Sequence, residues 1–193
     1  MRIGHGREGM PLGTEEVREV VAQAVAALDR RWRRVLVLVP DGTRTMPLPL
    51  LAGFLEEELG SRVEDLDYLV ALGTHRPMSD EQLTGLLGRK VRNGRAGRSR
   101  VFNHASTPDA LTCVGVLTAG QVSEITGGLL AEEVPVRVNR LVLEYDALLV
   151  CGPVFPHEVV GFSGGNKYFF PGIAGPEVIN LTHWLGALLS SYE

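Results

Sequence analysis

The residues best suited to chemistry gather in the last quarter of the chain. A short apolar run ends at Gly-Pro and is followed by His157, so we expect a buried strand to deliver this histidine into a loop at its carboxyl end. A glycine-rich loop follows, in which Gly164 and Gly165 allow positive φ and a close approach of the backbone to an anion or a cofactor. Lys167 comes directly after this loop.

Lys167 stands out because the chain otherwise supplies positive charge with arginine. Among the 19 basic residues, only Lys90 and Lys167 are lysines. An amine can lose its proton and form a covalent bond, which a guanidinium cannot do. The composition therefore makes Lys167 a candidate for covalent attachment. The alternative is a lysine whose stem lies on the aromatic residues 168–170 while its ammonium group stays in water.

Two upstream segments also carry polar groups after apolar runs. Asp41 and Arg44 follow the first such run, and His75 follows the second. In parallel α/β sheets the ligand crevice lies at the carboxyl ends of the strands, so we expect these three residues and His157 to line one cleft. Arg44 is suited to bind a carboxylate through two oxygens, with Asp41 orienting its guanidinium. The alternative for this pair is an exposed salt bridge in a turn.

The histidines suggest proton transfer and metal binding. Taken alone, His75 or His157 would be interpreted as structural, but their shared placement after strands favours a pair of imidazoles that each take or return a proton near neutral pH. His183 has no carboxylate or cysteine neighbour, so it can bind a metal only if a cofactor supplies the other ligands. For His104 we expect a structural role, in which its ring bonds the loop backbone.

The elements that must position these groups alternate between helix and strand. Helices are predicted from Thr14 along an apolar stripe to Trp32, at 47–59, from an N-cap at Ser79, at 138–145, and from Pro176 onward. Strands are predicted at 35–39, 67–72, 101–104, 113–118 and 147–151, with a break at 134–137 and an exposed basic loop at 89–100. This order predicts a single α/β domain over residues 1–193, with a doubly wound, mostly parallel sheet and helices on both faces.

Composition argues against several classes of protein. A net charge of -4 gives no electrostatic reason to expect nucleic acid, and no apolar run approaches the roughly 18 residues of a membrane helix. We expect no signal peptide, because the first residues lack an apolar core. Cys113 and Cys151 lie in apolar runs and are expected to be buried free thiols, which favours a reducing, cytoplasmic setting.

Five of these segments together resemble a known family. They are Asp41-x-x-Arg44, Gly73-Thr-His75-Arg-Pro, His157, Gly164-Gly165-x-Lys167 with Pro171-Gly172, and His183. In this order they resemble the N-terminal domain of nickel-dependent lactate racemase and its 2-hydroxy-acid racemase and epimerase relatives, from about residue 35 to the C-terminus.

The resemblance implies a cofactor and roles for individual residues. Lys167 would carry, through a thioamide, a pyridinium mononucleotide pincer that binds nickel, and His183 would ligate the metal. The glycines and proline of the matching loop, Gly164, Gly165, Pro171 and Gly172, would surround this cofactor, and His75 and His157 would be the acid/base pair. Family members have a C-terminal domain that closes over the cofactor. This chain ends at Glu193 without it, so a second domain or subunit is an expected partner.

The leading hypothesis is therefore a racemase or epimerase of a small 2-hydroxy acid. Two other interpretations stay open. One is a zinc hydrolase in which His75, His157 and His183 bind the metal and water takes the fourth position. The other is a cofactor-binding or carrier module without catalysis of its own. Metal analysis distinguishes the zinc hydrolase from the racemase. Activity measured with and without a second subunit distinguishes the carrier module from the racemase.

Overall fold

The computed structural model describes residues 3–28, 31–157 and 161–189. Its α-helices are α1 (Thr14–Ala26), α2 (Leu48–Leu59), α3 (Asp80–Leu87), α4 (Ala119–Ile125) and α5 (Pro176–Leu189). Its strands are β1 (Arg34–Val39), β2 (Asp65–Val70), β3 (Arg95–Ala96), β4 (Ser99–Asn103), β5 (Leu111–Leu117), β6 (Val134–Asn139), β7 (Ala147–Val150), β8 (Phe155–His157) and β9 (Gly161–Ser163). Short 3-10 helices are η1 (Pro108–Ala110), η2 (Arg140–Leu143) and η3 (Gly165–Tyr168). No helix within these described ranges is long and apolar enough to cross a membrane.

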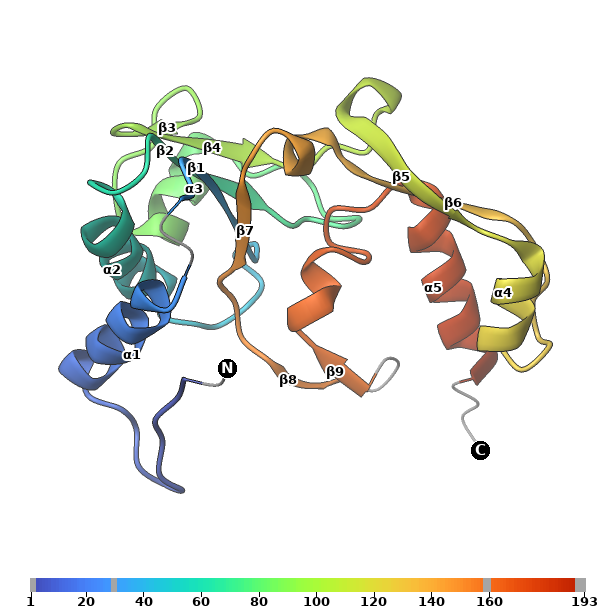
Figure 1. Cartoon of the computed structure of the whole chain (residues 1–193), viewed down its shortest axis with the longest axis horizontal. Helices are drawn as coiled ribbons and strands as arrows, with labels where there is room; N and C mark the ends of the chain where they lie inside the picture. The colour runs from blue at the N-terminus through green and yellow to red at the C-terminus, as the bar shows by residue number, and fades with distance from the viewer. Residues whose placement is uncertain (1–2, 29–30, 158–160, 190–193) are drawn as a thin grey trace.

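The central sheet has the strand order β3-β4-β2-β1-β7, and its last four strands run parallel (Figure 1). Only β3 is antiparallel to its neighbour. In β1, an interior strand, Val35 to Val39 are completely buried, because both faces of the sheet are covered. Burial on both faces explains the continuous apolar run in the sequence. The predicted α/β class with a mostly parallel sheet is confirmed.

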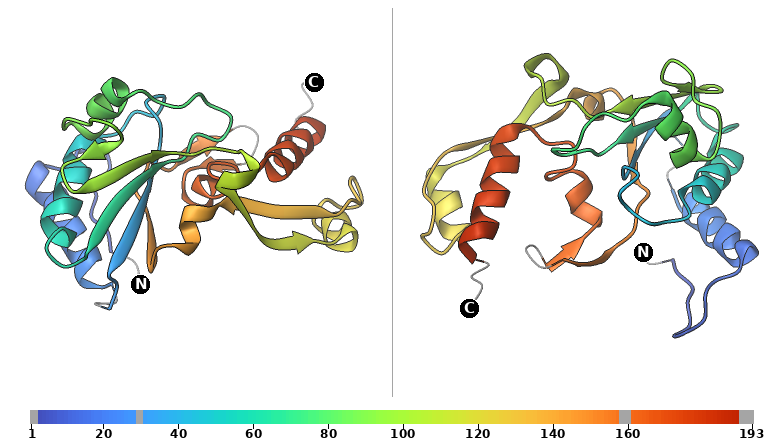
Figure 2. Two further views of the ribbon diagram at one scale, coloured as in Figure 1. Left: turned by 90° about the horizontal axis from the view of Figure 1, so that it is seen from above. Right: turned by 180° about the vertical axis from the view of Figure 1, so that it is seen from behind.

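One face of this sheet is covered by α-helices, and the other is covered by short 3-10 helices and the segment after η3. Val35, Val37 and Val39 point to a core that includes Leu48 and Leu83, and so to the side of α1, α2 and α3. The alternate residues of β1, Leu36 and Leu38, pack with Tyr145, Tyr168 and Ile173 on the other side. There the cover comes from η2, η3 and the segment after η3 (Figure 2). The second face therefore lies directly beneath the segment that carries Lys167.

Strands β5 and β6 form a separate antiparallel ribbon that projects away from the central sheet (Figures 1 and 2). Helices α4 and α5 lie along this ribbon, and their small apolar core contains Val122, Val134, Ala174 and Val178. An isolated bridge from Val138 to Ala174 joins β6 to the segment that leads into α5. The ribbon therefore supports the helix that carries His183.

Several local predictions are confirmed. Ser79 caps α3 by accepting a hydrogen bond from the backbone N–H of Gln82 at 3.2 Å, and Gln82 bonds back to the Ser79 N–H. Helix α2 ends at Leu59 before Gly60, and α5 starts at Pro176. Each of these signals is local, since it depends on the preferences of a cap or of a proline at a helix start.

The predictions for residues 134–145 were wrong. The segment 134–137 is not a break but the start of β6, and 138–145 is not an α-helix but the end of β6 followed by η2. The valines at 134, 136 and 138 alternate with the period of a strand. The prediction of a break relied on Pro135, but proline is tolerated in a strand at the edge of a sheet.

Three further predictions need correction. The basic segment 89–100 is not entirely loop, because β3 and β4 form a hairpin in it, with Gly97 at a positive φ of 62° in the turn. The first helix ends at Ala26, and Trp32 packs against the core from outside the helix. Cys113 is exposed rather than buried, because β5 belongs to the projecting ribbon and not to the central sheet.

Candidate active site

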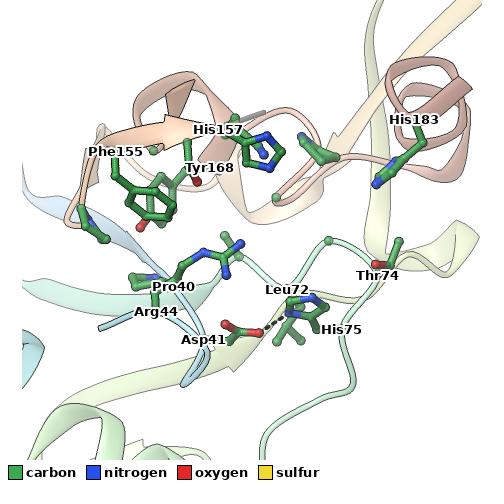
Figure 3. A pocket seen from close by; sticks show the side chains of 18 residues that line it. Pro40, Asp41, Arg44, Leu72, Thr74, His75, Phe155, His157, Tyr168 and His183 are labelled. Carbon is green, nitrogen blue, oxygen red and sulfur yellow. Dashed lines mark hydrogen bonds and ion pairs between the residues drawn. The ribbon is translucent and has the colours of Figure 1, made fainter. Parts of the chain in front are cut away.

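A cleft of about 210 Å³ opens at the carboxyl ends of β1 and β2 (Figure 3). Of the predicted site residues, its lining includes Asp41, Arg44, His75, His157, Gly164, Lys167, Pro171, Gly172 and His183. Gly165 is not part of the lining. The structure thus brings together groups that are spread over more than 140 residues of sequence.

One wall of the cleft is built from the loops after β1 and β2. Asp41 is 8% exposed, and its Oδ2 is hydrogen-bonded to Nδ1 of His75. A carboxylate can only accept, so Nδ1 of His75 carries the hydrogen and Nε2 keeps its lone pair when the ring is neutral. The side chain of His75 is 47% exposed, which leaves it accessible to a ligand.

The hydrogen bonds around Asp41 decide its charge. Burial alone would raise the pKa of this carboxyl group, but hydrogen bonds from Thr43 and His75 favour the anion. Together they outweigh burial and lower the pKa of Asp41 below its ordinary value. Asp41 is therefore ionised at neutral pH and holds His75 in one orientation.

Arg44 is positioned differently from the prediction. Its guanidinium lies over the ring of Phe155, with Cζ 5.8 Å from the ring centroid, and Nη1 donates to the hydroxyl of Thr43 at 3.2 Å. Asp41 does not bond this guanidinium directly in the described structure, because its two oxygens are directed to Thr43 and His75. The expected orientation of Arg44 by Asp41 is thus replaced by a contact through Thr43.

The opposite wall is a small hairpin, β8–β9, rather than a loop directly after a central strand. His157 is the last residue of β8 and pairs with Gly161, while Phe155 pairs with Ser163. Residues 151–154 lead from β7 to this hairpin, which lies apart from the central sheet (Figure 1). In Figure 3 His157 lies on this side of the cleft and His75 lies on the other.

The glycine loop shapes the wall mainly through contacts with its own chain. Gly164 has a φ of 89°, and a Cβ there would lie 2.2 Å from the carbonyl oxygen of Pro153. A Cβ on Gly172 would lie 2.4 Å from the carbonyl oxygen of Tyr168. Gly165 also has positive φ, at 53°, but has open space around it. The glycines therefore permit close packing of the backbone around η3, which carries Lys167.

A main-chain hydrogen bond joins the two walls. The N–H of Gly73, two residues before His75, donates to the carbonyl oxygen of Gly172 at 2.9 Å. The N–H of Gly172 in turn donates to the carbonyl oxygen of Lys167 at 2.9 Å. The loop of His75 and the turn of Lys167 are thus held at a fixed separation.

His183 reaches the cleft from α5, and Figure 3 shows its ring directed toward the cleft. Its Nδ1 donates to the carbonyl oxygen of Ile179, one turn earlier, at 2.7 Å. This bond leaves Nε2 with a free lone pair, which is the arrangement found for histidines that bind metals. No group of three His, Cys, Asp or Glu side chains able to hold a metal occurs within residues 3–28, 31–157 and 161–189.

A second hollow, of about 640 Å³, adjoins the cleft on the side of Lys167 and His183. Besides these two residues, its lining includes Phe162, Phe170 and Ala187. Phe162 is 64% exposed and Phe170 is 39% exposed, so both present apolar surface beside the lysine and the histidine. The lining also includes His157, so an amine, two imidazoles and apolar walls meet in one hollow, a combination that suits a flat ring.

Tyr168 and Thr43 are part of the site but were not predicted. Tyr168 is 7% exposed and lines the cleft, and burial with the nearby Cys151 raises its pKa to about 12, so its phenol remains protonated. The sequence signal for Thr43 was its place between Asp41 and Arg44, which allows a local hydroxyl to bond both. For Tyr168 the only signal was its position next to Lys167.

His104 lies outside this cleft and has a structural setting, as expected. It is 4% exposed, its Nε2 donates to the carbonyl oxygen of Ala174 at 3.1 Å, and its Nδ1 accepts from the amide of Asn139 at 3.2 Å. Burial lowers the pKa of His104, so the ring is neutral at physiological pH. It fastens the segment before α5 to β4 and β6.

Comparison with known proteins identifies the family of this chain. The model of the lactate racemase N-terminal domain family matches residues 10–192. Lactate racemase from Lactiplantibacillus plantarum is 28% identical over 176 residues, which cover 90% of this chain and 36% of that protein. Lactate racemase from Thermoanaerobacterium thermosaccharolyticum is 25% identical over 177 residues, covering 90% of this chain and 35% of that protein. The chain thus spans about a third of the length of these relatives.

Solved structures give the same result. A crystal structure of a protein from Thermotoga maritima superposes with a TM-score of 0.84 at 41% identity, covering 95% of this chain and 44% of that one. The lactate racemase apoprotein from Thermoanaerobacterium thermosaccharolyticum superposes with a TM-score of 0.60 at 25% identity, covering 82% of this chain and 34% of that one. With the family model matching almost the whole chain, this protein belongs to the lactate racemase N-terminal domain family.

Proposed function

We propose that this chain supplies the acid/base, substrate-binding and cofactor-binding groups of a 2-hydroxy-acid racemase or epimerase. The observation that carries the proposal is the placement of His75 and His157 on opposite walls of one cleft, with Arg44, Lys167 and His183 in the same lining. Racemisation needs an acid/base group on each side of the substrate. Here the loop after β2 would supply His75 on one side, and the β8–β9 hairpin would supply His157 on the other.

Arg44 is the proposed partner of the substrate carboxylate. A guanidinium presents two parallel N–H donors to a carboxylate, and the ring of Phe155 below Arg44 limits its movement. A carboxylate bound there would direct the adjacent carbinol carbon into the cleft that His75 and His157 line.

His75 and His157 would exchange the hydroxyl proton of the two enantiomers. For His75 the reacting atom is Nε2, because Nδ1 is held by Asp41. The ionised Asp41 also stabilises the imidazolium that forms when His75 takes a proton. The substrate hydroxyl of one enantiomer would face His75 and that of the other would face His157.

Lys167 and His183 would hold the nickel-pincer nucleotide, with Lys167 as the covalent tether and His183 as a metal ligand through Nε2. When bound, such a cofactor supplies a reversible acceptor for the hydrogen on the carbinol carbon. The apolar walls of the adjoining hollow, which include Phe162 and Phe170, would exclude water from its ring. Gly164, Pro171 and Gly172 would form the neighbouring surface.

A second domain or subunit is proposed to complete the site, since the named relatives are nearly three times as long as the matching segment. The zinc-hydrolase interpretation is less well supported. It requires His75, His157 and His183 to converge on one ion, whereas the described part of the chain contains no such cluster.

The test uses the protein isolated from its native host together with any second subunit. Incubation with each enantiomer of lactate and of larger 2-hydroxy acids should convert either enantiomer to the racemate, as followed by chiral chromatography. Intact mass should exceed that of the polypeptide by one cofactor, and metal analysis should find nickel. Zinc on an unmodified polypeptide would refute the proposal. An adduct without turnover, even with the second subunit present, would favour the carrier module.

A further inference from the structure

The hydroxyl of Thr43 lies between two groups that the proposed reaction uses. Its Oγ1 accepts from Nη1 of Arg44 at 3.2 Å and donates to Oδ1 of Asp41 at 2.6 Å. The backbone N–H of Thr43 donates to the same carboxylate oxygen at 3.1 Å. The other oxygen of Asp41 is bonded to His75.

The directions of these hydrogen bonds are fixed by chemistry. A guanidinium can only donate and a carboxylate can only accept, so the hydroxyl hydrogen must lie on the Asp41 side. A continuous chain therefore runs from Arg44 through Thr43 to Asp41, where it meets the Nδ1 hydrogen of His75. In the described structure no ion pair joins Arg44 to Asp41 directly, so this hydroxyl is the side-chain link between them.

We propose that Thr43 is a positioning residue that couples the carboxylate-binding guanidinium to the acid/base imidazole. The inference rests on the proposed function and adds a residue to it. With Oδ1 occupied by the hydroxyl and N–H of Thr43, the carboxylate of Asp41 cannot rotate without losing two hydrogen bonds. Its Oδ2 therefore stays on His75, and Nε2 of that ring stays directed to the substrate.

The same hydroxyl limits the guanidinium. Phe155 contacts one face of Arg44, and Thr43 accepts from one edge. The remaining N–H groups of the planar fork are then restricted to a small range of directions. Thr43 thereby helps to position both the group that binds the substrate carboxylate and the group that exchanges the proton of the substrate hydroxyl.

The chain offers matched variants to test this. Thr43→Val removes the hydroxyl at nearly constant volume, and Thr43→Ser keeps the hydroxyl while removing a methyl group. Thr45→Val is the control, because Thr45 is an exposed residue of the same loop, as Thr43 is, but its hydroxyl makes no hydrogen bond to Asp41, Arg44 or His75 in the described structure. The first measurement is the pKa of the Asp41 carboxyl group by carbon NMR on the full 193-residue chain. The second is kcat and KM for racemisation by the holoenzyme.

Thr43→Val should raise the pKa of Asp41, because a hydrogen bond to the anion is lost. It should also lower kcat/KM about tenfold or more, through both a higher KM and a lower kcat, as expected for hydrogen bonds to charged groups. Thr43→Ser and Thr45→Val should stay within about threefold of wild type. A purely structural threonine would reduce the folded fraction without changing KM or the pKa of Asp41.

Equal pKa values and kinetics for Thr43→Val and Thr45→Val would overturn the inference while leaving the proposed function intact. If Thr43→Val does not fold, Thr43→Ala and Thr43→Ser give the same comparison with and without the hydroxyl. If the wild-type holoenzyme racemises no 2-hydroxy acid, the proposed function fails. The carboxyl pKa then still decides, by itself, whether Thr43 holds Asp41.

Discussion

Gly152 should be intolerant of any side chain, because Tyr168 occupies the space that a Cβ would need. A Cβ on Gly152 would lie 1.7 Å from the hydroxyl oxygen of Tyr168 and 2.1 Å from its Cζ. Ordinary van der Waals contact begins at 3.4 Å, so in Gly152→Ala either the ring or the backbone must move by well over an ångström. Tyr168 is only 7% exposed and packs with Leu36, Leu38 and Ile173, so the ring can move only toward the cleft that it lines.

The cost can be estimated from overpacked cores. Forcing extra methyl groups into well-packed interiors typically costs about 1–3 kcal/mol, and the overlap here places Gly152→Ala at the upper end, about 3 kcal/mol. For a domain of this size that corresponds to a fall of about 6–12 °C in Tm. Because Lys167 directly precedes Tyr168, any covalent loading of the lysine should fall as well.

Urea unfolding and thermal melts of Gly152→Ala measure this cost, and Gly53→Ala provides a control of opposite sign. Gly53 lies within α2, and apart from its chain neighbours and the backbone of its own helix no atom lies within 4 Å of the position that an alanine methyl group would take, so alanine should stabilise the protein by about 0.5–1 kcal/mol. In the double variant Gly152→Ala/Tyr168→Leu, the two costs should be less than additive, because the shorter side chain relieves the overlap. Equal melting temperatures for Gly152→Ala and wild type would refute the packing argument.

The other predictions concern the cleft. His75→Ala and His157→Ala should each lower kcat by at least about a hundredfold while changing Tm by no more than about 2 °C, as measured by chiral assay and thermal melts. Lys167→Arg should carry no adduct by mass spectrometry, whereas His183→Ala should keep the adduct and bind nickel more weakly. Because the pKa of Asp41 is lowered by folding, its carboxylate stabilises the fold above the ordinary value of 3.8, and this contribution is lost as pH falls through the folded pKa. Urea titrations of Asp41→Asn should therefore show less acid destabilisation than wild type, and parallel curves would contradict this.

The wall formed by Asp41 and His75 could be predicted from the sequence because it depends on local patterns and a general rule. The run from 35 to 39 is too uniformly apolar for a strand with one wet face, so a buried parallel strand was the consistent interpretation. Polar groups after parallel strands then gather at one edge of the sheet. The pairing of Asp41 with His75 was not predictable, because it depends on how two loops 34 residues apart are oriented.

The other wall could not be derived in this way. Residues 152–163 contain prolines and glycines, which locally favour a loop, whereas in the structure Phe155 pairs with Ser163 in a hairpin. The ribbon of β5 and β6 was missed for a related reason. Its alternating valines were interrupted by Pro135, and its strand state depends on packing against α4 and α5. Tertiary contacts overrode local signals in both segments.

The walls of the cleft are joined through the backbone rather than through side chains. Gly73 and Gly172, Gly172 and Lys167, and Cys151 and Leu38 are joined by main-chain hydrogen bonds at 2.9 Å, which do not depend on most side chains. They do require a glycine at 172, since a Cβ there would lie 2.4 Å and 2.8 Å from the carbonyl oxygens of Tyr168 and Lys167. Substitutions in the cleft lining can therefore change substrate contacts while the separation of the walls is kept by the backbone. Gly172→Ala should consequently disturb both walls together, whereas a change at Phe162 should alter only the surface presented to ligands and a change at Phe155 should also remove the contact that restricts Arg44.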